Sequence, residues 1–193
     1  MEFKQWLERE VMVPVQGADQ KDDYDCGPGA LRGIAKLFGH DKSQNDMIRM
    51  TDAGKRKGTH PEDLVKAARK MGMNAVMKEN MTLELLLKQL KLGRPVICAV
   101  QAWGDKKDYH KLEDGHYLVA IGFSTSKKEI WFEDPSIHDG KRGRMPFDQF
   151  MQRWFDKEAY VKPGEKVKPH LGIIVWDNKQ VNPDYETTAK RIP

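Results

Sequence analysis

The stretch Gln20-Lys21-Asp22-Asp23-Tyr24-Asp25-Cys26-Gly27-Pro28-Gly29-Ala30 places a cysteine at the start of a predicted helix. Apolar residues follow it at helical spacing, Pro28 suits the first turn, and Gly39 is positioned to end the helix. A thiol at such a helix start faces unpaired backbone N–H groups and the positive end of the helix dipole, and both favour the thiolate. Cys26 is therefore either a reactive nucleophile or an ordinary cysteine that begins a helix.

The composition indicates one soluble domain. The chain has 193 residues, of which 39% are hydrophobic and 32% charged, so it can bury one core beneath a polar surface. The net charge of +4 is mild and basic residues are interspersed with acidic ones, so nucleic acid is not indicated as a partner. We find no pattern of a signal peptide or a membrane span, and therefore expect a cytoplasmic protein. The oligomeric state stays open.

Helical patterns fill the first half of the chain and strand patterns fill the second. We expect helices at 2–9, 26–38, 43–53, 60–71, 82–92 and 146–155, and strands at 11–15, 74–78, 95–103, 116–123, 129–134 and 171–176. Thr59 and Glu62 have the spacing of a capping box. This order favours an α+β fold, with an N-terminal helical part packed on a C-terminal antiparallel sheet.

The same pattern suggests where the domain begins and ends. Residues 1–10 are expected to be an N-terminal extension, residues 11–176 the domain, and residues 177–193 a loosely held polar tail. Residues 104–115 and 135–145 are expected to be loops.

His116 is the best candidate base among the six histidines, because it opens an apolar strand that would fix its position. The strands 116–123 and 129–134 have the pattern of a hairpin with its turn centred near Thr125. In that register Asp134 lies opposite His116, on the same face and about 5 Å away. Asp134 would then hold one imidazole nitrogen while the other faces the thiol. A register shifted by one residue would remove this arrangement.

Gln20 lies six residues before the cysteine. In acyl transfer, the carbonyl oxygen becomes negatively charged and needs preorganised donors, which a side-chain amide and the N–H of the nucleophile's residue can supply. Taken by itself, Gln20 equally suits a solvated loop.

The combination of these motifs is more specific than any one of them. Gln20 is followed by Asp25-Cys26-Gly27, then by Asp114-Gly115-His116-Tyr117 opening one apolar strand, and by Glu133-Asp134-Pro135 closing the next. This pattern resembles the papain-like cysteine peptidase superfamily. Within it, the chain is similar to the bacteriocin-processing (double-glycine leader) peptidases and their free-standing relatives, over about residues 10–176.

The resemblance implies a role for each of four residues. Cys26 would be the nucleophile, His116 the base and acid, Asp134 its orienting group, and Gln20 the oxyanion donor. It implies a cofactor-free peptidase or amidase that hydrolyses a peptide or isopeptide bond through a thioester, with a peptide or protein as substrate.

Other functions remain open at this point. An acyltransferase or transamidase can use the same triad, because an amine can resolve the thioester instead of water. A catalytically silent member of the fold would act as a binding module. Peptidase domains of the resembling family are often fused to the membrane and ATPase parts of an export machine, which this sequence lacks. We therefore do not expect leader cleavage during export.

Three further features of the sequence bear on partners and core. The aspartates at 19, 22, 23 and 25 partly match a calcium loop, but its turn glycine and terminal glutamate are missing, so no metal is expected. The aspartates between Gln20 and Cys26 are expected to be solvated loop residues instead. Lys141-Arg142-Gly143-Arg144 is expected to be a solvated basic loop, with an acidic or phosphate-bearing partner as the alternative. Cys98 lies in an apolar strand pattern, so we expect a core residue without a disulfide to Cys26.

Overall fold

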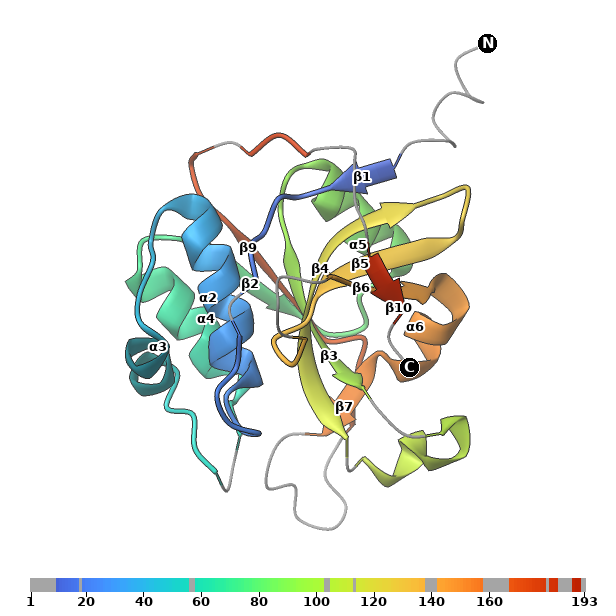
Figure 1. The fold of residues 1–193 in the computed structure, drawn as a ribbon, viewed down its shortest axis with the longest axis horizontal. Helices are drawn as coiled ribbons and strands as arrows, with labels where there is room; N and C mark the ends of the chain where they lie inside the picture. Colours follow the sequence, from blue (N-terminus) through green and yellow to red (C-terminus); the bar gives the residue numbers. More distant parts are fainter. Residues whose placement is uncertain are drawn as a thin grey trace.

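The chain folds as helices on a large sheet (Figure 1). The structure is a computed structural model, and it describes residues 10–17, 19–55, 58–102, 105–112, 114–137, 142–157, 167–179, 181–183 and 189–191. The helix predicted at residues 2–9 and the residues Trp103 and Lys141 lie outside these ranges.

Five α-helices and ten strands are formed by the described residues. The helices are α2 (Cys26–Phe38), α3 (Gln44–Met50), α4 (Pro61–Lys70), α5 (Leu83–Lys91) and α6 (Phe147–Arg153), with a 3-10 helix η1 (Lys106–Lys111). The strands are β1 (Glu10–Met12), β2 (Asn74–Lys78), β3 (Val96–Gln101), β4 (Gly115–Ser124), β5 (Glu129–Glu133), β6 (Arg142–Pro146), β7 (Phe155–Lys157), β8 (Val167–Pro169), β9 (Gly172–Trp176) and β10 (Ala189–Arg191).

The main sheet runs in the order β10-β6-β5-β4-β3-β9-β2, and β1 pairs with β4 off this path. Its pairs are antiparallel except for the parallel pair of β10 with β6. Helices α2, α3 and α4 contact one another on one side of the sheet, and α6 packs on β5 and β6 on the other (Figure 1). The predicted α+β arrangement is therefore confirmed, although β1 and β2 come from the N-terminal half.

The central strands form the core. β3 is buried along its whole length, and β4 is buried at every residue after Gly115. Strands covered on both faces read as continuous apolar runs, which is why these segments were recognisable. Cys98 lies in β3 as a buried free thiol, as predicted, and burial raises its pKa.

The predicted register of the β4–β5 hairpin is wrong. Val119 pairs with Glu133, two residues beyond the partner that the predicted register gives it, and Trp131 pairs with Gly122. The turn begins only after Ser124, which pairs with Glu129, and the register shifts between Ala120 and Gly122. A longer turn and a bulge both change which residues pair across the two strands. Neither feature can be recognised from the alternation of apolar residues in the sequence.

Two segments predicted to be loops contain regular structure. The predicted loop 135–145 contains most of β6, whose arginines pair with β5: Arg142 with Glu133 at 2.8 Å and Arg144 with Glu129 at 3.2 Å. These charges are satisfied within the fold, which corrects the expectation of a solvated basic loop. The predicted loop 104–115 contains η1.

The helix predicted to reach Phe155 ends at Arg153, and β7 begins at Phe155. The Thr59 capping box is also wrong, because His60 is the N-cap of α4 and no side-chain cap is formed there.

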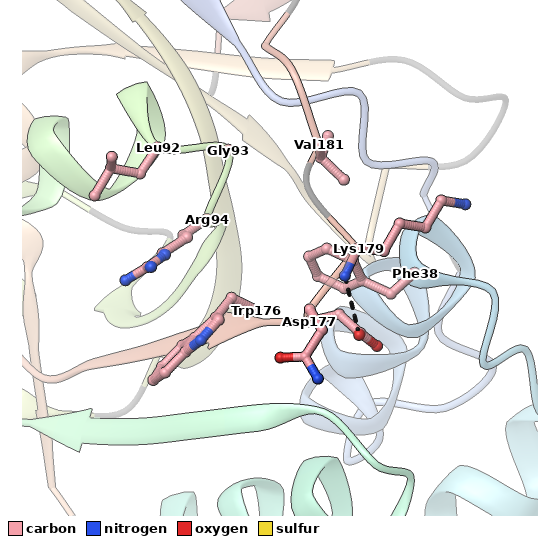
Figure 2. A pocket seen from close by; sticks show the side chains of 9 residues that line it. Phe38, Leu92, Gly93, Arg94, Trp176, Asp177, Lys179 and Val181 are labelled. Atoms are coloured by element: carbon pink, nitrogen blue, oxygen red, sulfur yellow. Dashed lines mark hydrogen bonds between the residues drawn. The ribbon is translucent and has the colours of Figure 1, made fainter.

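The described residues after β9 make specific contacts, unlike the loosely held tail that we expected. Val181 lies beside Gly93 at a hollow of about 260 Å³ (Figure 2). A Cβ atom added to Gly93 would lie 2.0 Å from the Val181 carbonyl oxygen. Asp177 bonds to His40, after the end of α2, at 2.6 Å. Further on, β10 forms an edge strand of the main sheet.

This packing predicts an unequal effect of alanine at two glycines with positive φ. Gly93→Ala adds a clash with Val181 to backbone strain and should lower the free energy of unfolding by about 2–4 kcal/mol. Gly39→Ala is the matched control, because Gly39 has φ +85° and no atom within 4 Å of an added Cβ. Its loss should be about 1–2 kcal/mol. Urea denaturation measures both, and equal losses would contradict packing of Val181 on Gly93.

Candidate active site

Cys26 is the first residue of α2 and is half-buried. The first N–H groups of a helix have no partner within the helix, so the thiol and the N–H of Cys26 lie at an electropositive end. The other end of α2 is closed by Gly39 in the left-handed conformation, as predicted. Helix α2 packs against β4, the strand that carries His116.

His116 and Asp134 meet despite the wrong register. His116 is buried at the start of β4, paired with Val100 of β3, and its Nε2 lies 2.8 Å from Asp134 Oδ1. Asp134 follows the last residue of β5, so its carboxylate reaches His116 from a turn rather than from a ladder position. The same oxygen accepts hydrogen bonds from the Ser136 N–H at 2.9 Å and from Ser136 Oγ at 2.7 Å.

This pair determines the protonation of the imidazole. Burial lowers the pKa of His116, but hydrogen bonds and charge at Asp134 and Cys26 outweigh burial and raise it to about 9. Burial raises the pKa of Asp134, and the bonds from His116 and Ser136 outweigh it, so that pKa lies below its usual range. With Nε2 on Asp134, Nδ1 is the ring nitrogen left to face Cys26. An imidazolium therefore lies between the Asp134 carboxylate and the Cys26 sulfur at neutral pH.

Gln20 lies on the loop that approaches this pair. Its backbone N–H donates to the carbonyl of Pro135 at 2.9 Å, which ties the Gln20 loop to the turn that presents Asp134. Its side-chain Nε2 donates to the carbonyl of Asp22 at 3.1 Å. Its Oε1 is buried and has no hydrogen-bond partner among the described residues. No pattern in the sequence indicates this link between the two loops.

Asp25 corrects the expectation that the aspartates of this loop are solvated. It is fully buried, and its carboxylate accepts hydrogen bonds from the backbone N–H groups of Lys21 and Asp22, each at 3.1 Å. Gln44 of α3 donates its Nε2 to the other carboxylate oxygen at 3.0 Å. The position of Asp25 immediately before a helix-starting cysteine was the one sequence feature that could have indicated a buried role for it.

A part-buried ion pair anchors the segment that leads to Gln20. Arg142 binds Glu133 and also donates to the carbonyl of Val15 at 3.2 Å. Burial raises the pKa of Glu133, although the Arg142 guanidinium opposes the shift. Gly17 passes so close that an added Cβ would lie 2.7 Å from Glu133 Oε2. Sequence reasoning assigned no role to this pair.

The wall beside the thiol is closely packed. A Cβ added to Gly27 would lie 3.0 Å from Thr59 Cβ and 3.2 Å from the ring of Tyr117. The Tyr117 hydroxyl donates to the Thr59 carbonyl at 3.1 Å. The start of α2, the start of α4 and the start of β4 thus meet beside Cys26.

Neither a metal site nor a membrane-spanning helix is found among the described residues. Within the described ranges, no group of three or more His, Cys, Asp or Glu side chains is arranged to hold a metal ion. Among the same residues, no helix has the length and apolar character that crossing a bilayer requires.

The fold matches solved peptidase structures. The peptidase domain of Streptococcus ComA, a bifunctional ABC transporter involved in quorum sensing, aligns with TM-score 0.62 and 23% identity over 85% of this chain and 99% of that one. A protein described as a C39-like peptidase from Bacillus anthracis aligns with TM-score 0.67 and 16% identity over 89% and 99%. A double-glycine motif protease from an AMS/PCAT transporter, in complex with its leader peptide, aligns with TM-score 0.56 and 16% identity over 86% and 96%.

The chain has the fold of papain-like cysteine peptidases. Residues 12–160 match the model of the Peptidase_C39 like family, and the chain belongs to that family. It is also 29% identical over 150 residues to the pediocin PA-1 transport/processing ATP-binding protein PedD of Pediococcus acidilactici. That alignment covers 78% of this chain and spans 19% of the length of PedD.

The buried His116–Asp134 contact predicts an unusual titration. In NMR spectra the ring resonances of His116 should titrate near pH 9, well above the ordinary 6.5. Asp134→Ala removes a hydrogen bond and a charge that favour the imidazolium, so it should lower the midpoint. The stabilising effect of the imidazolium is complete below pH 6.5 and is lost as the pH rises through about 9. A wild-type midpoint near pH 6.5 would contradict the conclusion that Asp134 and Cys26 raise the pKa of His116.

Proposed function

We propose that this chain hydrolyses a peptide or isopeptide bond through a thioester on Cys26. The observation that carries the proposal is the buried His116, bonded to Asp134 at 2.8 Å and interacting with the thiol at the start of α2. Family membership supports the same class of reaction.

In the first half-reaction the Cys26 sulfur attacks the carbonyl carbon of the substrate. The thiol proton resides on His116, so the attacking species is a thiolate paired with an imidazolium. Negative charge then develops on the carbonyl oxygen, where the N–H of Cys26 and the side-chain amide of Gln20 would donate to it. The carbon–nitrogen bond breaks as His116 gives its proton to the leaving amine. A thioester and a neutral imidazole remain.

In the second half-reaction water resolves the thioester. Neutral His116 takes a proton from the water, the oxygen attacks the thioester carbon, and the carbon–sulfur bond breaks. The products are a carboxylic acid, the Cys26 thiolate and the His116 imidazolium, so atoms and charge balance. Asp134 keeps Nδ1 directed at the sulfur and the reacting atoms by holding Nε2.

The roles of Cys26 and Gln20 are separable by substitution. A suitable test substrate is a peptide with a Gly-Gly pair, since one matched structure is described as a double-glycine motif protease. Cys26→Ala should abolish cleavage, measured by mass spectrometry, whereas Cys98→Ala, the control, should retain it. Gln20→Ala should lower kcat/KM by about 10²–10³, because one oxyanion donor is lost. Full activity of Gln20→Ala would remove that residue from the mechanism.

The nature of the acceptor separates hydrolase from acyltransferase. We expect the N-terminal product of the same peptide to carry a free carboxylate, because water resolves the thioester. The digest is repeated over a range of glycinamide concentrations, from low to excess, and the product masses are compared. An amide product that dominates at low glycinamide concentration would favour the transamidase alternative. Absence of any product, together with ordinary alkylation of Cys26, would favour a catalytically silent binding module.

A further inference from the structure

The aspartate that precedes the nucleophile does not act as an ordinary helix cap. Asp25 is the N-cap residue of α2, a position where an aspartate usually accepts a hydrogen bond from the first turn. Here its side chain makes no capping bond. A capping bond would go to the second or third residue of the helix. The N–H of Cys26, at the first position, has no partner within the helix whether or not the cap forms.

The carboxylate turns back into the preceding loop instead. Its Oδ1 accepts from the N–H groups of Lys21 and Asp22, and the Lys21 N–H also lies 3.3 Å from Oδ2. The backbone N–H of Asp25 donates to the carbonyl of Asp22 at 3.3 Å. Asp25 and the residues directly after Gln20 thus form a compact hydrogen-bonded turn, whose shape fixes the distance between Gln20 and Cys26.

Gln44 holds this carboxylate from α3. It is buried, and its Nε2 lies 3.0 Å from Asp25 Oδ2 and 3.4 Å from the Asp25 carbonyl oxygen. Its own Oε1 is buried with no partner among the described residues. A polar side chain with an unsatisfied oxygen is costly in a core where an apolar side chain would fit. The bond from Gln44 to Asp25 explains why a glutamine occupies this buried position.

The same turn is fixed from the opposite side. The Asp22 carbonyl accepts from Gln20 Nε2 at 3.1 Å, and the Gln20 N–H donates to the Pro135 carbonyl. The side-chain amide of Gln20 is therefore placed by a turn that depends on Asp25, next to the turn that presents Asp134.

We propose that Asp25, held by Gln44, is a positioning residue that places the Gln20 amide and the Cys26 N–H as one oxyanion site. This inference rests on the proposed function. The positioning acts through hydrogen-bond geometry and does not require the negative charge. In Asp25→Asn, the remaining oxygen can accept from Lys21 and Asp22, and the new amide can donate to Gln44 Oε1 once the Gln44 amide rotates.

The test compares two reactions of the same thiol. Acylation by p-nitrophenyl acetate, followed as the burst of p-nitrophenolate, develops an oxyanion, whereas alkylation by iodoacetamide does not. Asp25→Ala should slow acylation by at least about tenfold, and at most by the 10²–10³ that complete loss of an oxyanion donor causes. Alkylation should stay within about twofold, since the Cys26–His116 pair is untouched. Asp25→Asn should restore most of the acylation rate, and the exposed Asp23→Ala is the control.

A double-mutant cycle identifies the route of the effect. In a Gln20→Ala background, Asp25→Ala should cause little further loss of acylation, because both changes disable the same donor. Equal losses of acylation and alkylation in Asp25→Ala, failure of Asp25→Asn to restore acylation, or fully additive effects with Gln20→Ala would overturn the positioning role. If the wild type shows no burst, the proposed function itself fails. A wild-type burst with an unchanged burst in Asp25→Ala overturns only the inference.

Discussion

The hydrogen bond between His116 and Asp134 is the interaction on which the site depends. Both side chains are almost fully buried, with 2% and 3% exposure, so their attraction is weakly screened by water. A buried imidazole would by itself be neutral, and the carboxylate keeps it charged. The protein thus maintains a cation beside a thiol without exposing either group fully. The strands β3 and β4 and the turn after β5 provide the rigid support that this requires.

Two loops meet at this pair and are bonded to each other. The turn after β5 presents Asp134, and the loop before α2 presents Gln20, with a backbone hydrogen bond from Gln20 to Pro135 between them. The part-buried pair of Glu133 and Arg142 ties the chain before Gln20 to the same end of β5. His116, Asp134 and Gln20 are therefore placed by one connected set of contacts. The hollow beside Val181 is lined by Gly93 and Arg94, just before β3 begins, whereas His116 pairs with Val100 near the other end of that strand.

The correct contact between His116 and Asp134 followed from an incorrect register. The prediction assumed a regular hairpin, but the turn is longer and a bulge lies between Ala120 and Gly122. Asp134 still reaches the imidazole because it lies in the turn beyond β5, where the backbone is not constrained by pairing with β4. In contrast, Asp25 was expected to be a solvated loop residue, but it is buried and bonded to Gln44, nineteen residues away.

The sequence by itself determined the helix at Cys26, the apolar strands and the order of the four candidate residues, because these depend on local periodicity, caps and motif spacing. The tertiary structure decided which polar groups are buried and what they bond. Asp25 with Gln44, Glu133 with Arg142 and Gln20 with Pro135 each join segments that are distant or conformationally independent in the chain. Local patterns carry no record of such pairs, since burial of a charge depends on partners that only the folded chain brings together.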